Sequence, residues 1–346
     1  GYLLITYYGF KLNKNPIKKY KNIKTGENYD LYRDGLRIYT TINSKMQQYA
    51  EESVEQHMPV IQRKLNSILK NNGAKMWKDR ENIIKDAMKI SERWRAMKEE
   101  DIPEDAIRKS FLKPVQMKVF AWNAKREIDT VMTPRDSIKY HKQLLQTSFV
   151  AMDPKTGEVR CWVGGIDFKW FKYDHVTALR QVGSTIKPLI YTLAVQDAGY
   201  TPSTIIEGGP VKYGKEMKTF NGGGGTLANC LAFSKNTASV RLTNLVGVNR
   251  VIEFANDIGI KAKLPPYTSI ALGAAEIPML QMLGAYSMFP NKGYNAEPIF
   301  ISRIEDKNGN LLQEFTTETK QVINEQDAFT MVKLMEGVVE IGTGRA

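Results

Sequence analysis

The chain has 346 residues, enough for one large domain or two, and its 42% hydrophobic and 10% aromatic residues are typical of a folded protein rather than a disordered one. Two cysteines, 69 positions apart, and three scattered histidines argue against a zinc site, a disulfide framework or a histidine triad, so we expect no metal and no cofactor. The net charge of +12 is concentrated in residues 1–146, which carry 29 Lys and Arg against 18 Asp and Glu, whereas residues 147–346 carry 20 against 19.

This basic first part is compatible with several partners. It would suit anionic lipid head groups, an anionic polymer or nucleic acid. An ordinary solvated helical surface explains the same charge equally well. No aromatic-interleaved nucleic-acid motif accompanies it, so we expect no nucleic-acid partner.

Residues 1–34 are predicted to be a linker from a preceding domain, since residues 11–30 are polar, basic and poor in large apolar groups. The early run YLLITYY is far too short to span a bilayer, no signal peptide is present, and the first residue is not methionine. We therefore expect a fragment of a longer chain.

Residues 35–146 are predicted to be an entry strand, a long helix and a charged subdomain. GLRIYTTI (35–42) alternates like a strand, and Ser44 can cap the helix that follows, in which apolar residues recur at helical spacing as far as Ile68. Residues 71–146 are charged, contain three tryptophans and are predicted to be mostly helical.

Residues 147–346 are predicted to form the main domain. It opens with the hairpin SFVAMDPKTGEVRCWVGG (148–165), whose turn is Asp153–Gly157. Helical patterns follow, and a second hairpin is indicated at 301–315. The predicted helices cover 184–198, 226–247, 249–257, 276–288 and 325–339. A few strands with many helices are typical of an α+β fold.

The segment RQVGSTIKPLIYTL (180–193) contains the first candidate site. Its apolar residues recur at helical spacing and Pro188 is tolerated only in a first turn, so the pattern predicts an amphipathic helix with Ser184 at its N-terminus. Gly199 follows the run and is expected to end this helix. Lys187, three residues on, could then reach the Ser184 hydroxyl and act as its base if burial lowers the lysine pKa. Gly183 would let a substrate approach the backbone closely.

The spacing of this pair is weak support by itself. Ser-x-x-Lys also occurs at Ser67–Lys70 and at Ser110–Lys113. From the spacing alone, Ser184 and Lys187 could equally be two polar residues on a helix surface.

The second candidate element is SKN, Ser234-Lys235-Asn236, which lies in a break between two helical patterns. A break of this kind can direct side chains into a cleft. The Ser234 hydroxyl could relay a proton, and the Asn236 amide could bind a substrate amide as donor and acceptor together. Two helix-capping residues are the simpler interpretation of this pair alone.

Taken together, GSTIKP and the SKN that follows 50 residues later resemble the penicilloyl serine transferases, whose motifs are S-x-x-K, S-x-N and K-[ST]-G. Longer segments are similar to the transpeptidase domain of class A (bifunctional) penicillin-binding proteins. They are GLRIYTTINSKMQQYAE, SFVAMDPKTGEVRCWVGG, SIALGAAEI, LGAYSMFPNKG and VVEIGTGRA. The resemblance runs from about residue 31 to the end and is weakest over 55–140.

This resemblance implies an α+β penicillin-binding, β-lactamase-like fold and a D,D-transpeptidase that cross-links peptidoglycan stem peptides. Ser184 would attack the carbonyl between two terminal D-alanines while Lys187 takes its proton. Ser234 would help protonate the departing D-alanine, and Asn236 would bind the amide of the acyl side chain. β-Lactam antibiotics would acylate the same serine.

The resemblance also implies the setting of the parent protein. A glycosyltransferase domain and a membrane anchor would precede Gly1, at the periplasmic face of the bacterial inner membrane. The partners would be stem peptides or a lipid-linked precursor, β-lactams and other cell-wall synthesis proteins.

The third family motif, K-[ST]-G, is the point at which this sequence departs most from the family pattern. Lys-Thr-Gly occurs at Lys24–Gly26 and at Lys155–Gly157, but both precede Ser184, whereas the family places this motif on a strand after S-x-N. We interpret both as chance matches. The final Gly342-Thr343-Gly344 resembles a tripeptide that precedes the K-T-G strand, so we expect the domain to be incomplete, without that strand, its cation and one oxyanion N–H.

Three alternatives remain open. A class B penicillin-binding protein or a β-lactamase shares the motifs, although GLRIYTTI and GTGR favour class A. A catalytically incompetent scaffold at the cell wall or membrane surface would explain the absent third motif. Nucleotide binding is disfavoured, because the glycine-rich NGGGGTLAN lacks the GK[ST] ending of a phosphate-binding loop, and we interpret this segment as a flexible connection.

Overall fold

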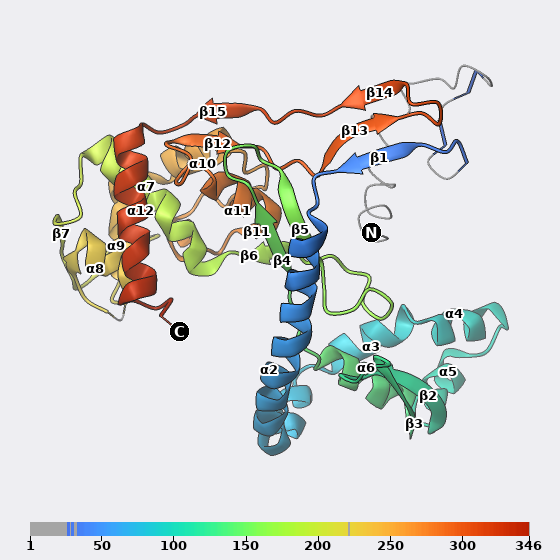
Figure 1. Ribbon diagram of the computed structural model, residues 1–346. Coiled ribbons are helices and arrows are strands. Elements are labelled where there is room, and N and C mark those ends of the chain that lie inside the picture. The colour runs from blue at the N-terminus through green and yellow to red at the C-terminus, as the bar shows by residue number, and fades with distance from the viewer. Residues whose placement is uncertain (1–25, 28, 31–32, 221, 346) are drawn as a thin grey trace. The chain divides into compact units, whose positions relative to one another are not determined.

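The computed structural model (Figure 1) describes residues 26, 27, 29, 30, 33–220 and 222–345. Lys24 and Thr25 of the first Lys-Thr-Gly match lie outside the described residues. The chain divides into two compact units. One takes in the chain up to Ala50, then Ser148–Gly164 and the residues from Tyr173 onward, and the other comprises Glu51–Thr147 and Gly165–Lys172.

The second unit is a small helical body with a hairpin that the sequence analysis missed. Its helices are α2 (Ser44–Lys78, from Glu51 onward), α3 (Glu81–Lys89), α4 (Glu92–Glu99), α5 (Glu104–Ser110) and α6 (Pro134–Lys142). Strands β2 (Val115–Phe120) and β3 (Glu127–Met132) pair antiparallel. Helices account for most of residues 71–146, as predicted, and the β2–β3 ladder is the element that the prediction did not include.

The start of α2 also differs from the prediction. The Asn43 side chain, rather than that of Ser44, caps the helix, because Asn43 Oδ1 accepts a hydrogen bond from Met46 N at 3.1 Å. Ser44 is already the first helical residue. Among the described residues, no helix combines the length and the apolar composition that a membrane span requires.

The first unit contains short antiparallel sheets, and both predicted hairpins are confirmed. β1 (Arg37–Thr40), β13 (Ile301–Glu305) and β14 (Leu311–Glu314) form a three-stranded sheet in the order β1-β13-β14. β4 (Phe149–Met152) pairs with β5 (Val159–Val163). In the turn between β4 and β5, Asp153 Oδ1 accepts from the backbone N–H groups of Lys155 and Thr156. The second Lys-Thr-Gly match is therefore part of this hairpin turn.

The described part of the first unit has four further two-stranded pairs. They are β6 (Leu179–Gln181) with β11 (Glu276–Pro278), β7 (Ile205–Ile206) with β10 (Gly225–Thr226), β8 (Val211–Tyr213) with β9 (Glu216–Lys218), and β12 (Tyr294–Ala296) with β15 (Thr319–Gln321). The β8–β9 pair is a tight hairpin, and the other three pairs join segments separated by longer stretches of chain. The helix predicted at 276–288 is thus wrong at its start: its first three residues form β11, and α11 spans Met279–Tyr286.

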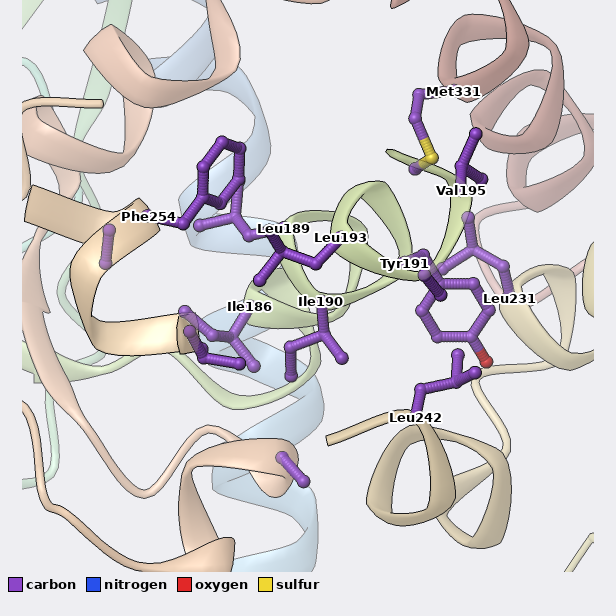
Figure 2. Packing of buried hydrophobic residues seen from close by; sticks show 14 of the residues in the cluster. Ile186, Leu189, Ile190, Tyr191, Leu193, Val195, Leu231, Leu242, Phe254 and Met331 are labelled. Carbon is purple, nitrogen blue, oxygen red and sulfur yellow. The ribbon is translucent and has the colours of Figure 1, made fainter. Parts of the chain in front are cut away.

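The other helices of the first unit share one hydrophobic core with α7 (Lys187–Ala198), which lies at its centre (Figure 2). They are α8 (Leu227–Ala232), α9 (Asn236–Val246), α10 (Val248–Asp257), α11 and α12 (Glu325–Glu340), with short 3-10 turns η2 (Gly183–Ile186) and η3 (Thr268–Leu272). Gly199 ends α7 in the left-handed conformation, as the sequence predicted.

The predicted amphipathic character of this helix is wrong. Every residue from Lys187 to Val195 is buried, including the residues that lie outside the predicted apolar stripe. Elements α9 and α12 both pack on α7, so it has no solvent-facing side over this stretch. A helix that is buried all round carries its polar groups into the core, where each needs a partner.

Gly337 gives a prediction on stability, because it lies inside α12, where glycine weakens a helix. A Cβ added there would meet Ala232 Cβ of α8 at 3.9 Å, an ordinary contact distance. We expect Gly337→Ala to raise the free energy of unfolding by about 1 kcal/mol, measured by denaturant titration. Gly342→Ala is the matched control and should destabilise, since its Cβ would lie 2.1 Å from the Ala232 carbonyl oxygen. A loss of stability in Gly337→Ala would contradict the packing of α12 on α8.

Candidate active site

Ser184 lies in the 3-10 turn η2, directly before α7, and is exposed. The helix itself begins at Lys187, with Pro188 in its first turn. The helix was predicted over 184–198 with Ser184 at its N-terminus, and its α-helical part begins one turn later than predicted, at Lys187. The consequence is that Ser184 is exposed while Lys187, three residues later, is only 1% exposed.

The backbone on both sides of Ser184 is held from another part of the chain. Val182 N donates to Ala275 O at 3.1 Å, and Gly183 N donates to Gly273 O at 3.2 Å. Gly183 has φ +53°, a left-handed conformation that favours glycine. A Cβ at Gly273 would lie 1.9 Å from Gly183 O, so only glycine fits at this approach.

Tyr286 supports the same turn from α11. Its hydroxyl donates to the Thr185 carbonyl oxygen at 2.6 Å, next to Ser184 in the chain. Burial raises the pKa of the Tyr286 hydroxyl above its ordinary value, so this donor keeps its proton. The turn that carries Ser184 is thus held by Gly273, Ala275 and Tyr286, none of which the sequence analysis assigned to the site.

Ser234 occupies an unusual backbone position at the end of α8. Ser234 N donates to Leu231 O and Lys235 N donates to Cys230 O, both at 2.9 Å. This pair of bonds is the Schellman motif, whose left-handed position is usually glycine. Here that residue is Ser234, with φ +51°. The strained conformation places a hydroxyl where a glycine would have none.

The four predicted polar residues are brought together, but in a different order from the one expected. Lys187 Nζ donates to Ser234 O at 2.6 Å, to Ser234 Oγ at 2.9 Å and to Asn236 Oδ1 at 2.8 Å. Ser234 Oγ donates to Ser184 Oγ at 2.9 Å. No hydrogen bond joins Lys187 directly to Ser184 in this described part of the chain. Lys187 is therefore connected to Ser184 through Ser234.

The charge state of Lys187 follows from its surroundings. Three acceptors account for the three N–H donors of a protonated amine. No carboxylate is among these three acceptors, so none of them brings a negative charge to compensate that of the buried ammonium. Burial lowers the pKa of Lys187 from its ordinary value to about 8. About a tenth of the amine is therefore neutral at pH 7, far more than for an ordinary lysine, and neutral Lys187 can accept a proton.

The other two Ser-x-x-Lys matches have no comparable surroundings. Ser67 Oγ donates back to Arg63 O within α2, and Ser110 Oγ donates to Ile107 O at the end of α5. Neither serine is hydrogen-bonded to the lysine of its own motif in the described structure. Cys161 and Cys230 are both buried and free.

The left-handed backbone at Ser234 makes a prediction of its own. Ser234→Gly and Ser234→Ala both remove the hydroxyl, so their difference isolates the backbone. We expect the glycine variant to be more stable than the alanine variant by about 1 kcal/mol in denaturant unfolding, because alanine is strained at positive φ.

Ser239 supplies the matched control for that comparison. It lies inside α9, where the backbone is helical and glycine is unfavourable. We therefore expect the order to reverse there, with Ser239→Ala more stable than Ser239→Gly. Equal stability of the two Ser234 variants would show that the left-handed conformation is not maintained in solution.

Comparisons with known proteins match both parts of the chain. A family model described as penicillin-binding protein middle domain matches residues 72–145, and one described as penicillin binding protein transpeptidase domain matches residues 147–346. Penicillin-binding protein 1A of Aquifex aeolicus is 31% identical over 95% of this chain and 47% of its own length. Penicillin-binding protein 2D of Bacillus subtilis is 36% identical over 57% of this chain and 30% of its own length.

The solved structure of penicillin-binding protein 1A from Haemophilus influenzae has a similar fold. It covers 98% of this chain and 59% of its own chain, with a TM-score of 0.61 at 19% sequence identity. This likeness supports the predicted fold class. The chain spans less than half the length of the two curated relatives above.

Proposed function

Because the chain belongs to the penicillin-binding protein transpeptidase family, we propose that it cross-links peptidoglycan stem peptides through an acyl-enzyme formed on Ser184. The observation that carries this proposal is the hydrogen-bonded series Lys187–Ser234–Ser184, in which a buried amine of lowered pKa is connected to an exposed hydroxyl. A nucleophilic serine needs such a base, and no histidine is among its hydrogen-bonding partners here.

The geometry favours a relayed proton transfer. With Lys187 neutral, the Ser184 proton passes to Ser234 Oγ while the Ser234 proton passes to Lys187 Nζ. Ser184 Oγ then forms the bond to the carbonyl carbon of the penultimate D-alanine, and that carbonyl oxygen takes up the negative charge. The reverse relay delivers a proton to the leaving amine, the terminal D-alanine departs, and an ester on Ser184 remains.

Asn236 has a double role in this proposal. Its Oδ1 accepts from Lys187 and so fixes the amine beside Ser234. Its amide nitrogen keeps two N–H donors, which can bind a carbonyl oxygen of the acyl side chain. Gly183, with its left-handed backbone and open surroundings, lets the substrate approach the turn closely.

The setting of the whole protein is part of the proposal. Several relatives are named penicillin-binding protein 1A. We propose that the parent protein is anchored in the bacterial inner membrane and faces the periplasm, that it also carries a peptidoglycan glycosyltransferase domain, and that it works with other cell-wall synthesis proteins. β-Lactams would acylate Ser184 because their strained amide imitates the scissile peptide bond.

Mass spectrometry tests the proposal. The full-length protein is incubated with a labelled penicillin, the intact mass is measured, and the adduct is located by peptide mapping. We expect one adduct, on the peptide that contains Ser184, and none with the same penicillin after its β-lactam ring has been hydrolysed. A second assay, D-alanine release from an acylated peptide ending in D-Ala-D-Ala, addresses the natural reaction.

Two outcomes would contradict the proposal. An adduct on another residue would remove Ser184 as the nucleophile. Absence of any adduct, with the protein folded and retained on a peptidoglycan matrix, would instead support a scaffold without catalytic activity.

A further inference from the structure

We propose that Lys235, the middle residue of SKN, is a positioning residue for the transpeptidase site, so this inference rests on the proposed function. Its backbone belongs to the turn that presents Ser234 and Asn236, and its ammonium holds the glycine segment Gly222–Gly225. Lys235 Nζ donates to the Gly224 carbonyl oxygen at 2.6 Å. The side chain thus ties the catalytic turn to a segment that the sequence analysis regarded only as a flexible connection.

The glycine segment belongs to an excursion, residues 205–226, that is fastened to α9 by side-chain donors. Besides Lys235, Thr237 Oγ1 donates to Phe220 O, and Asn244 Nδ2 donates to Lys212 O. Arg241 donates to three carbonyl oxygens of this backbone, those of Glu207, Gly208 and Pro210, at 2.9, 2.7 and 3.0 Å. Every one of these bonds ends on a main-chain oxygen, so the excursion is fastened through its backbone in addition to the burial of Ile206 and Val211 in the core.

The glycine segment passes so close to neighbouring backbone that a side chain would not fit at Gly224. A Cβ at Gly224 would lie 2.3 Å from Ile206 O and 2.4 Å from Gly208 N. A Cβ at Gly225 would lie 3.3 Å from Lys235 Nζ, and one at Gly222 would lie 3.4 Å from Lys235 Cγ. The segment therefore lies along the whole Lys235 side chain, from stem to ammonium.

Lys235 thereby restrains the positions of the neighbouring site residues. The Schellman bond from Lys235 N to Cys230 O fixes the backbone end of this side chain, and the Gly224 carbonyl fixes its other end. Loss of the ammonium removes the bond that ties the glycine segment directly to the turn, and with it one restraint on the placement of Ser234 and Asn236. Acylation depends steeply on the placement of these two groups, so Lys235 acts on the reaction without touching the substrate.

Three variants of the full-length protein test the assignment. Lys235→Met removes the donor and keeps the stem, Lys235→Arg restores a donor, and Lys215→Met removes the same charge from the exposed β8–β9 turn of the same excursion. Penicillin acylation is followed over a range of concentrations, so that the binding constant and the acylation rate constant are separated. We expect Lys235→Met to lower the rate constant about tenfold, Lys235→Arg to stay within about threefold of the parent, and Lys215→Met to match it.

Two further readouts distinguish positioning from other roles. Amide hydrogen exchange over Gly222–Thr226 should be faster in Lys235→Met than in Lys215→Met. The midpoint of the pH–rate profile should stay where it is in the parent, because Lys235 acts through the backbone and not on the charge of Lys187. A shifted midpoint, or equal impairment of the Met and Arg variants, would overturn the assignment.

The outcome is separable from that of the proposed function. Unchanged acylation in Lys235→Met, with an adduct that still maps to Ser184, would reject the role of Lys235 and leave the nucleophile in place. An adduct elsewhere in the parent protein would reject the proposed function itself.

Discussion

Replacing Ser184 by alanine is expected to abolish the penicillin adduct, because the covalent bond is formed by the Oγ atom that the substitution removes. Ser184 is exposed, and within the described residues its Oγ accepts a single hydrogen bond, from Ser234. We therefore expect the free energy of unfolding to change by no more than about 1 kcal/mol. Loss of labelling without loss of folding is the combination that identifies a nucleophile.

The chain offers matched controls for this experiment in its two other Ser-x-x-Lys sequences. Ser67→Ala and Ser110→Ala remove the same atom from the same motif, but both hydroxyls are hydrogen-bonded within their own helices. We expect both variants to be labelled like the parent when the intact mass is measured. Labelling that persists in Ser184→Ala, or that disappears in Ser67→Ala, would refute the assignment.

The sequence was sufficient to select this serine but not to describe its surroundings. Local features, namely Pro188 in a first turn and Gly199 after the helix, were enough to predict where α7 ends and that Ser184 lies near its start. The burial of α7 on every side could not be predicted in the same way. It depends on α9 and α12, which follow later in the chain, and the spacing of apolar residues within α7 carries no record of them.

The connection between Lys187 and Ser184 was beyond local reasoning for a related physical reason. Helical spacing predicts a direct contact at i, i+3, but Ser184 precedes the helix, and Ser234 is hydrogen-bonded to both residues. That arrangement depends on the left-handed backbone at Ser234. The signal was available in part: SKN follows a helical run directly, at the position where a Schellman motif places its left-handed residue.

Replacing Lys187 by methionine is expected to lower the acylation rate by about a thousandfold or more. Methionine fills a similar buried volume but can neither accept a proton nor donate to Ser234 and Asn236. These acceptors are only partly buried, so water can replace the lost bonds and the fold should be retained. Lys70→Met and Lys113→Met, the lysines of the other two motifs, are the matched controls and should leave acylation unchanged.

Lys187→Arg separates the role of the base from the role of the charge. Arginine keeps a positive charge and several donors, but its pKa is so high that it is never neutral in a protein. If Lys187 only fixes Ser234 and Asn236, the arginine variant retains part of the acylation rate. If Lys187 is the base, the arginine variant is as slow as the methionine variant, and that is the result we expect.

The pH dependence provides the independent measurement. Burial lowers the pKa of Lys187 to about 8, so the neutral amine that accepts the proton becomes more abundant as the pH rises through this value. The acylation rate should therefore rise from about pH 6 and level off above about pH 9. Stability changes in the same direction: the unfolded chain binds the lysine proton up to its ordinary pKa of 10.5, so the penalty of burying the charged form is complete below about pH 8 and is relieved between 8 and 10.5. A rate that does not change between about pH 6 and about pH 9 would mean that the base is a group other than Lys187.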